Sequence, residues 1–290
     1  MYLPQFKYVT PQSLPETLSI LKEKKGISVP IAGGTDVLVL MKKGNLHPQY
    51  LISLRNLSEL NGIKLKKQQC IIGSGVTVSQ IENSGLYPVN AAIRDLVNQM
   101  ATPQIRNRAT IGGNLCTAAA CADFPPVLLV NDATVTLARK TGTRNVPLQT
   151  FFTGPRETIR EEDELMVSIS LRKSNAGSAY IKFGNRKAGN IPIVGVACSL
   201  TLESGRIKEL KVAVTAAAPT PVLVEEAHQV AISKKPETET WDAVVATIPG
   251  ALAPISDLRG SANYRINLAK IATRRALRKA HSRILRESDA

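Results

Sequence analysis

Two short glycine-rich segments hold the residues of this sequence that could bind a charged ligand. Gly33-Gly34-Thr35-Asp36 and Gly112-Gly113-Asn114 each follow an apolar run and lead into helix-forming residues. Glycine pairs allow positive φ and let backbone amides approach a ligand with no Cβ in the way. A loop that enters a helix also offers unpaired N–H groups and a partial positive charge. The two corners therefore predict a phosphate-containing ligand held by backbone amides.

A comparison of magnitudes shows that amides could hold phosphates without Lys or Arg in these loops. A hydrogen bond to a charged group contributes roughly 1.5–3 kcal/mol. Four to six of them offset association costs of about 4–15 kcal/mol, provided that other parts of the ligand also bind. Neither corner is a known phosphate motif, because Gly-x-Gly-x-x-Gly after a strand and Gly-Lys-Ser/Thr are both missing. A single Gly-Gly corner is usually a plain turn, so the pair carries the hypothesis.

The chain offers little catalytic machinery of its own. Its three histidines, His47, His228 and His281, are scattered, and no Ser-His-Asp order, metal triad or carboxylate pair emerges. We therefore predict no catalytic residue and no metal ligand, which fits a protein whose bound cofactor carries the chemistry.

The cysteines do not form a disulfide framework, because four is too few and their spacing too irregular. We expect buried reduced thiols at Cys70, Cys116, Cys121 and Cys198. Cys116 and Cys121 stand five residues apart, which leaves a metal or cluster role open for this pair.

The elements that position the corners are recognisable from periodicity and caps. Ser13 and Glu16 have capping-box spacing before Leu14, Leu18 and Leu21 on one helical face. Strands are predicted at 27–31, 50–54, 70–72 and 76–78, and a helix at 90–100. Later strands are predicted at 165–171, 179–183, 194–202 and 207–214, and their spacing predicts an antiparallel meander. Helical patterns follow at 222–250 and 263–286, and the most natural linker lies near 174–177.

Composition is that of a packed protein, with 43% hydrophobic and 21% charged residues. We find no run of about 18 apolar residues and no secretory signal, so we predict no membrane span and a cytoplasmic location. The net charge is 37 − 23 = +14, and the segment 265–290 is especially basic. That segment places Leu268, Ile271, Ala272 and Ala276 at helical spacing. Three interpretations stay open for its charges: a solvated helix face, a docking surface for an acidic partner, and nucleic-acid contact, which lacks aromatic stacking platforms.

Three stretches resemble one protein family. They are IAGGTDVLVLMKKG (31–44), TPQIRNRATIGGNLCTAAACADFPPVLLVNDATV (102–135) and AAAPTP (216–221). They resemble the FAD-binding subunit of molybdenum hydroxylases of the xanthine dehydrogenase and carbon monoxide dehydrogenase kind, in consistent order from about residue 3 to 285. Position 35 is Thr, where some relatives carry His, and no insertion with clustered cysteines is present.

The resemblance implies an α+β fold with two domains. Residues 1–175 would form a two-lobed FAD-binding domain of the vanillyl-alcohol oxidase (PCMH) type. Residues 176–290 would form a smaller domain with an antiparallel sheet and packed helices. Non-covalent FAD would lay its pyrophosphate across Ala32, Gly33, Gly34, Thr35 and Asp36 and across Ile111, Gly112, Gly113 and Asn114, with a hydroxyl from Thr110. Asp123 would face the ribose or adenosine side. Lys182, Ile191, Ala101 and Met166 would lie near the isoalloxazine.

The resemblance also implies partners and an electron path. Substrate would be oxidised at a molybdenum cofactor in a large subunit, and [2Fe-2S] clusters in a small subunit would pass electrons to this flavin. NAD⁺, a quinone or another carrier would then accept them. Two alternatives stay open, namely a stand-alone flavin oxidoreductase of similar fold and a basic nucleic-acid-binding protein.

Overall fold

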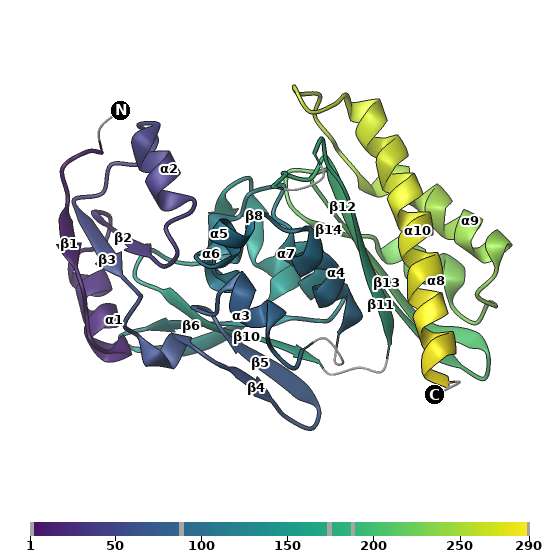
Figure 1. The fold of residues 1–290 in the computed structure, drawn as a ribbon, viewed down its shortest axis with the longest axis horizontal. Helices are drawn as coiled ribbons and strands as arrows, with labels where there is room; N and C mark the ends of the chain where they lie inside the picture. Colours follow the sequence, from purple (N-terminus) through teal and green to yellow (C-terminus); the bar gives the residue numbers. More distant parts are fainter. Residues whose placement is uncertain (1–2, 87–89, 173–175, 187–188, 289–290) are drawn as a thin grey trace.

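The chain folds as an elongated series of three bodies. The computed structural model describes residues 3–86, 90–172, 176–186 and 189–288. A small sheet with two helices lies at the N-terminal end, a larger sheet with helices lies in the middle, and a sheet backed by a long helix lies at the C-terminal end (Figure 1). Within this described part, no helix is long and apolar enough to cross a membrane.

The first lobe is a three-stranded parallel sheet in the order β1-β3-β2 with two helices. Its elements are β1 (Lys7–Val9), α1 (Leu14–Glu23), β2 (Ser28–Ile31), α2 (Val37–Lys42) and β3 (Tyr50–Ser53). Helix α1 begins as predicted, because the Ser13 hydroxyl accepts a hydrogen bond from Glu16 N at 3.3 Å. The Glu16 carboxylate reaches Gln12 N instead of closing the box on Ser13. The apolar run after the first glycine corner forms α2.

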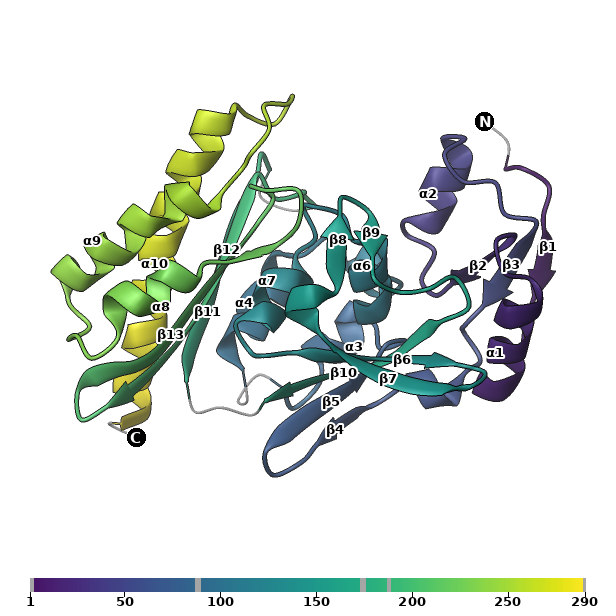
Figure 2. The ribbon, with the colours of Figure 1, turned by 180° about the vertical axis from the view of Figure 1, so that it is seen from behind.

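The second lobe is a five-stranded antiparallel sheet in the order β4-β5-β10-β6-β7, with short helices over one face (Figures 1 and 2). Its strands are β4 (Ile63–Leu65), β5 (Gln69–Gly73), β6 (Thr134–Arg139), β7 (Gly142–Pro147) and β10 (Leu165–Arg172). Its helices are η1 (Ser58–Leu60), α3 (Val78–Glu82), α4 (Ala91–Gln99), α5 (Pro103–Arg106), α6 (Ile111–Thr117), α7 (Phe124–Leu129) and η2 (Leu148–Thr150). This lobe also contains a small separate hairpin, made of β8 (Phe152–Gly154) and β9 (Glu157–Thr158).

The strand predicted at 76–78 is wrong. Thr77 caps helix α3 with a complete capping box, in which Gln80 N donates to Thr77 Oγ1 and Thr77 N donates to the Gln80 side chain. An isolated bridge to Thr110 is the only strand-like pairing of Thr77 in the described chain. The Thr-x-x-Gln spacing outweighed the local apolar pattern, because it satisfies two backbone donors that a strand end would leave free.

The C-terminal body is the predicted antiparallel meander, in the order β11-β12-β13-β14. Its elements are β11 (Gly177–Phe183), β12 (Val194–Glu203), β13 (Arg206–Thr215), β14 (Val222–Leu223), α8 (Glu225–Ala231), α9 (Thr238–Thr247), η3 (Ile248–Ala251) and α10 (Ala262–Ser288). Helices α8 to α10 cover one face of this sheet (Figure 2), and α4 and α7 of the second lobe contact the other. The range 222–250 is thus not helical throughout, since it starts with β14.

The α+β class with two lobes and a C-terminal sheet is therefore confirmed. The predicted boundary between residues 175 and 176 falls at the edge of the described residues and stays a prediction.

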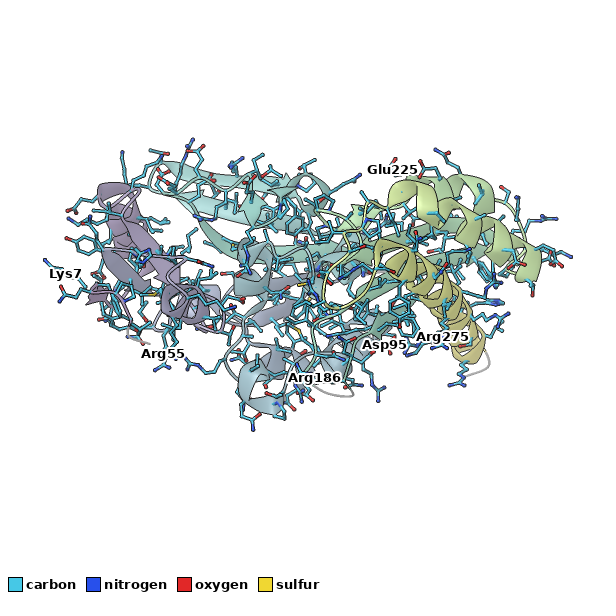
Figure 3. All side chains as sticks on the ribbon, turned by 90° about the horizontal axis from the view of Figure 1, so that it is seen from above. Lys7, Arg55, Asp95, Arg186, Glu225 and Arg275 are labelled. Carbon is cyan, nitrogen blue, oxygen red and sulfur yellow. The ribbon has the colours of Figure 1, made fainter. Side chains whose placement is uncertain are left out.

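The basic helix α10 is partly committed to contacts inside the chain. Its apolar residues Leu268, Ala272 and Ala276 are buried as predicted, whereas Ile271 is exposed. Lys279 and Arg283 bind the buried Asp95 of α4, with nitrogen–oxygen distances of 2.7 Å (Figure 3, where Asp95 is labelled). A purely solvated basic face is therefore wrong for this helix, and part of the charge surplus has a structural use.

Asp95 joins three elements. It also accepts a hydrogen bond from Tyr180 N of β11, at 3.1 Å. Burial alone raises the pKa of Asp95, but the hydrogen bonds from Arg283, Lys279 and Tyr180 N outweigh it and lower the pKa from its ordinary value. The carboxylate therefore stays charged in the folded protein and holds α10 against the second lobe.

We expect Asp95→Asn to lower the free energy of unfolding by about 3 kcal/mol, because it leaves two cations and a buried site without their anion. Urea unfolding of the full chain measures this. The matched control is Asp242→Asn. Asp242 is an exposed residue of α9 that pairs with Arg274 of α10, so its loss should cost less than about 1 kcal/mol. Equal losses in the two variants would contradict the role of Asp95.

Candidate functional site

The two glycine corners meet in space. A Cβ placed on Gly33 would lie 1.9 Å from the carbonyl oxygen of Arg108, just before the second corner. A Cβ on Gly112 would lie 2.6 Å from the Cβ of Ser74. Both glycines are therefore required by close packing of backbone against backbone, and the predicted approach of the corners is present.

A cleft of about 460 Å³ opens between the two lobes at this junction. Its volume lies within the range of roughly 300–1,000 Å³ that is usual for cofactor and ligand sites. Predicted site residues that line it are Ala32, Gly33, Gly34, Thr35, Asp36, Thr110, Gly112, Gly113, Asn114 and Met166. Apolar side chains from both lobes complete the walls, among them Leu40, Leu54, Leu60 and Met100. The cleft thus combines polar backbone with apolar surface.

The first corner has unpaired backbone donors. Among the described residues, none accepts a hydrogen bond from the N–H groups of Gly33, Gly34, Thr35 or Asp36. Gly34 has φ +77°, a conformation that favours glycine. These residues are half-buried, so their N–H groups can reach a ligand in the cleft. This wall of the cleft can therefore bind an anion.

The second corner is held together internally. Ile111 N and Gly112 N donate to the carbonyls of Val76 and Ser74, both at 3.0 Å, and Gly113 N donates to Thr110 Oγ1 at 3.0 Å. Thr110 therefore caps α6, and its own hydroxyl hydrogen is left for a ligand. The Asn114 side-chain oxygen is buried and has no hydrogen-bond partner in the described part of the chain. Its surroundings suit a ligand that brings a donor.

Asp123 and Lys182 form a buried pair that does not itself line the cleft, although Lys182 Nζ also donates to the carbonyl of Gln99, next to the cleft residue Met100, at 3.4 Å. Lys182 Nζ lies 3.0 Å from Asp123 Oδ2, and its side chain is 2% exposed. Tyr180 donates its hydroxyl to Asp123 Oδ1 at 2.8 Å. Burial raises the pKa of Asp123, while the charge of Lys182 and the hydrogen bonds from Tyr180 and Lys182 act against it. Burial and the adjacent Asp123 carboxylate raise the pKa of Tyr180.

This contact bears on two separate predictions. Asp123 was expected on the ribose or adenosine side and Lys182 near the isoalloxazine, yet their side chains touch. Both carboxylate oxygens of Asp123 are used inside the cluster. The two residues therefore act as one unit, and their contacts with a ligand stay predictions.

The remaining predicted residues surround this cluster or lie in the core. Ala101 follows α4 with φ 54°, next to the cleft residue Met100. Ile191 is 55% exposed in the loop between β11 and β12, and Lys182 Nζ donates to the neighbouring carbonyl of Asn190 at 3.0 Å. Ile111 is fully buried, so its part in the site is its backbone.

Sequence reasoning missed two arginines that line the cleft. Arg156 and Arg160 come from the β8–β9 hairpin and the segment after it, far along the chain from either corner. Arg160 donates to the carbonyls of Glu161 and Glu164, both at 2.8 Å. No local pattern marks these residues, because only the pairing of the lobes brings them to the site.

All four cysteines were expected to be buried, and two of them, Cys116 and Cys121, are not fully buried. Cys70 and Cys198 are buried, and burial raises the pKa of the Cys70 thiol to about 11. Cys116 and Cys121 are only partly buried, and Cys116 lines the cleft. All four are free thiols. The described residues contain no group of three or more His, Cys, Asp or Glu placed to hold a metal.

Comparison with known proteins assigns both parts of the chain. The family described as the FAD binding domain in molybdopterin dehydrogenase matches residues 4–172. The CO dehydrogenase flavoprotein C-terminal domain matches residues 179–280. A xanthine dehydrogenase FAD-binding subunit from Escherichia coli O157:H7 is 34% identical over 255 residues, which cover 86% of this chain and 87% of that protein.

Longer matches come from carbon monoxide dehydrogenase. The medium chain from Hydrogenophaga pseudoflava is 30% identical over 289 residues, 98% of this chain and 99% of that one. A solved structure of the dehydrogenase from the same organism superposes with a TM-score of 0.94 at 29% identity, covering 98% and 99% of the two chains. Quinoline 2-oxidoreductase from Pseudomonas putida 86 superposes with a TM-score of 0.92 at 27% identity, covering 98% and 100%.

We expect Gly33→Ala to lower the free energy of unfolding by about 3 kcal/mol or more, since its Cβ would overlap the Arg108 carbonyl. Thermal or urea unfolding measures the loss. Gly250→Ala is the control, because a Cβ there meets nothing within 4 Å. A Gly33→Ala variant as stable as the control variant would show that the corners do not pack as described.

Proposed function

Because this chain belongs to the family of FAD-binding subunits of xanthine dehydrogenase and carbon monoxide dehydrogenase-type molybdenum hydroxylases, we propose that it holds FAD in the cleft between its glycine corners. In this role it is the flavin subunit of an oxidoreductase complex. FAD, when bound, supplies the electron-transfer chemistry, and the polypeptide binds, orients and shields it.

One observation carries the placement of FAD. A loop with unpaired amides, Gly33 to Asp36, faces the same cleft as the capped corner at Thr110–Asn114. The amides of the first corner would hold the diphosphate. The second corner would contribute the Thr110 hydroxyl instead of its amides, because Ile111 N to Asn114 N already have partners inside the protein. The unpartnered oxygen of Asn114 would accept a hydrogen bond from the ligand. The apolar walls would exclude water from the rest of the cofactor.

Lys182 is proposed to stabilise negative charge at the N1–C2=O region of the isoalloxazine. Its buried ammonium is already fixed by Asp123 and by the carbonyl of Asn190, so it can act without reorganising. Ile191 and Ala101 lie on the loops next to this cluster and would border the ring. Asp123, itself bonded to Tyr180, would then hold Lys182 in place.

The electron path and the partners are part of this proposal. Electrons would arrive from [2Fe-2S] clusters of a small subunit, which takes them from a molybdenum-cofactor large subunit. They would leave for NAD⁺, a quinone or another carrier. Support comes from the relatives named as xanthine dehydrogenase and carbon monoxide dehydrogenase chains. The cytoplasmic location expected from the sequence belongs to the same proposal.

We expect the purified full-length chain to carry FAD and to release it on mild denaturation, because the cleft would bind it only through non-covalent contacts. The absorption spectrum of the native protein and of the supernatant after denaturation and filtration measures this. A colourless protein that also fails to bind added FAD would contradict the proposed function. Flavin that stayed with the precipitated chain would contradict non-covalent binding.

We expect Lys182→Met to lower the reduction potential of the bound flavin, by an electrostatic free energy on the order of 1 kcal/mol, because a nearby positive charge is lost. The variant also leaves Asp123 buried without its cation, which destabilises the fold. The Lys182→Met/Asp123→Asn double variant removes both charges and should recover stability but not the potential of the wild type. Potentiometric titration of the wild type, of Lys182→Met and of the double variant measures the three flavin potentials. Equal potentials would refute the role of Lys182.

A further inference from the structure

We infer that Arg156 is the cation that pairs with the phosphate groups of the bound dinucleotide. The inference rests on the proposed function, because it assigns a further binding residue to the same cleft. Arg156 lines that cleft together with the loop Gly33–Asp36 and with Asn114. It therefore faces the same space as the unpaired amides of the first corner.

The backbone at Arg156 is unusual for an arginine. Pro155 and Arg156 form the two-residue connection between β8 and β9, and Arg156 has φ 65°. A proline followed by a residue of positive φ is the type II turn pattern, whose second central position favours Gly or Asn. An L side chain there costs free energy that glycine would avoid. A strained position that keeps a long charged side chain points to a use for that side chain.

The strained turn is fixed to the second glycine corner's helix. Arg156 N donates to the carbonyl of Ala118 at 2.8 Å, and Ala118 is the C-cap residue directly after α6. Helix α6 begins at the second corner, so the hairpin and the corner are connected by one short helix. The position of the Arg156 side chain is thereby set relative to both walls of the cleft.

Among the residues that the structure describes, Arg156 is the basic cleft residue whose guanidinium has no hydrogen-bond or ion-pair partner, whereas Arg160 is bonded to backbone carbonyls. The other charged residues that line the cleft are Asp36, Arg160 and Glu164. Arg160 donates to backbone carbonyls, and Glu164 accepts from Arg144 at 2.6 Å. A dinucleotide that brings a negatively charged diphosphate into this cleft therefore meets a guanidinium that no other described residue binds.

Asp36 lies close enough to sense this cation. Burial raises the pKa of Asp36, and the charge of Arg156 acts in the opposite direction. No hydrogen bond joins the two side chains within the described structure, so the guanidinium is not consumed by the carboxylate. An anion placed between Arg156 and the amides of Gly33–Asp36 would be bound from two sides, and a guanidinium can do so with two parallel hydrogen bonds.

The test uses the full-length chain, stripped of flavin, and measures FAD binding by flavin fluorescence. Arg156→Gln should raise the Kd for FAD by about 10- to 100-fold, the value expected for losing a charged hydrogen bond. Arg156→Lys should lose less, because it keeps the charge. Arg156→Gly should lose as much affinity as Arg156→Gln, yet melt no lower than the wild type, since glycine relieves the strained φ. In Arg156→Gly the affinity for FAD would thus fall while the melting temperature does not. If Arg156 had only a structural role, both would fall together.

Two further readouts identify the part of the ligand that Arg156 contacts. The Ki of ADP, from competition with FAD and corrected for the Kd of FAD in each protein, should be higher in Arg156→Gln than in the wild type. The Ki of riboflavin, which has no phosphate, should not change. The salt dependence of FAD binding should be weaker in the variant. Arg139→Gln is the control, because Arg139 is an exposed arginine paired with Glu161 at 3.7 Å and does not line the cleft.

Three results would overturn the inference. They are wild-type affinity for FAD in Arg156→Gln and Arg156→Gly, an affinity loss that follows a loss of melting temperature, and riboflavin weakened as much as ADP. A wild-type chain that binds no FAD would instead overturn the proposed function, and the inference with it.

Discussion

The close approach of two backbone segments, Gly33 against the carbonyl of Arg108, is the constraint on which the rest of the structure depends. It joins the first lobe to the segment between α5 and α6 of the second, and the cleft lies between the two lobes. Any side chain at residue 33 would fill the junction. The same contact places the loop Gly33–Asp36, whose amides are free, opposite the second corner, whose amides are already bonded. One wall of the cleft can therefore donate backbone hydrogen bonds to a ligand, and the other cannot.

The second organising interaction lies on the other side of the middle lobe. Asp95 collects Lys279, Arg283 and Tyr180 N around one buried carboxylate, and so connects α4, β11 and α10. Helix α4 ends at Gln99, directly before the cleft residue Met100, and β11 carries Lys182. The C-terminal body is therefore attached to the elements that shape the cleft. This use of charge inside the chain also removes much of the reason to interpret the basic C-terminal segment as a nucleic-acid surface.

Much of the fold could be predicted from local signals, and the site only in part. The cap at Ser13, the meander from β11 to β13 and the glycine corners all follow from periodicity, turn residues and short spacings. The helix at Val78 was missed because a capping box outweighed an apolar triplet. Arg156 and the cluster of Asp123, Tyr180 and Lys182 arise from pairing between distant segments, which no local pattern encodes. Two predicted roles, at opposite ends of a ligand, fell on residues that touch.

The bonded state of the second corner has a consequence for the shape of the cleft. Ile111, Gly112 and Gly113 are fixed by Val76, Ser74 and Thr110 without any help from a ligand, so half of the cradle exists as soon as the middle lobe has folded. The first corner gains its partners only from what it binds. The shape of the second corner is therefore set by the chain itself, whereas the first corner leaves its amides for a ligand.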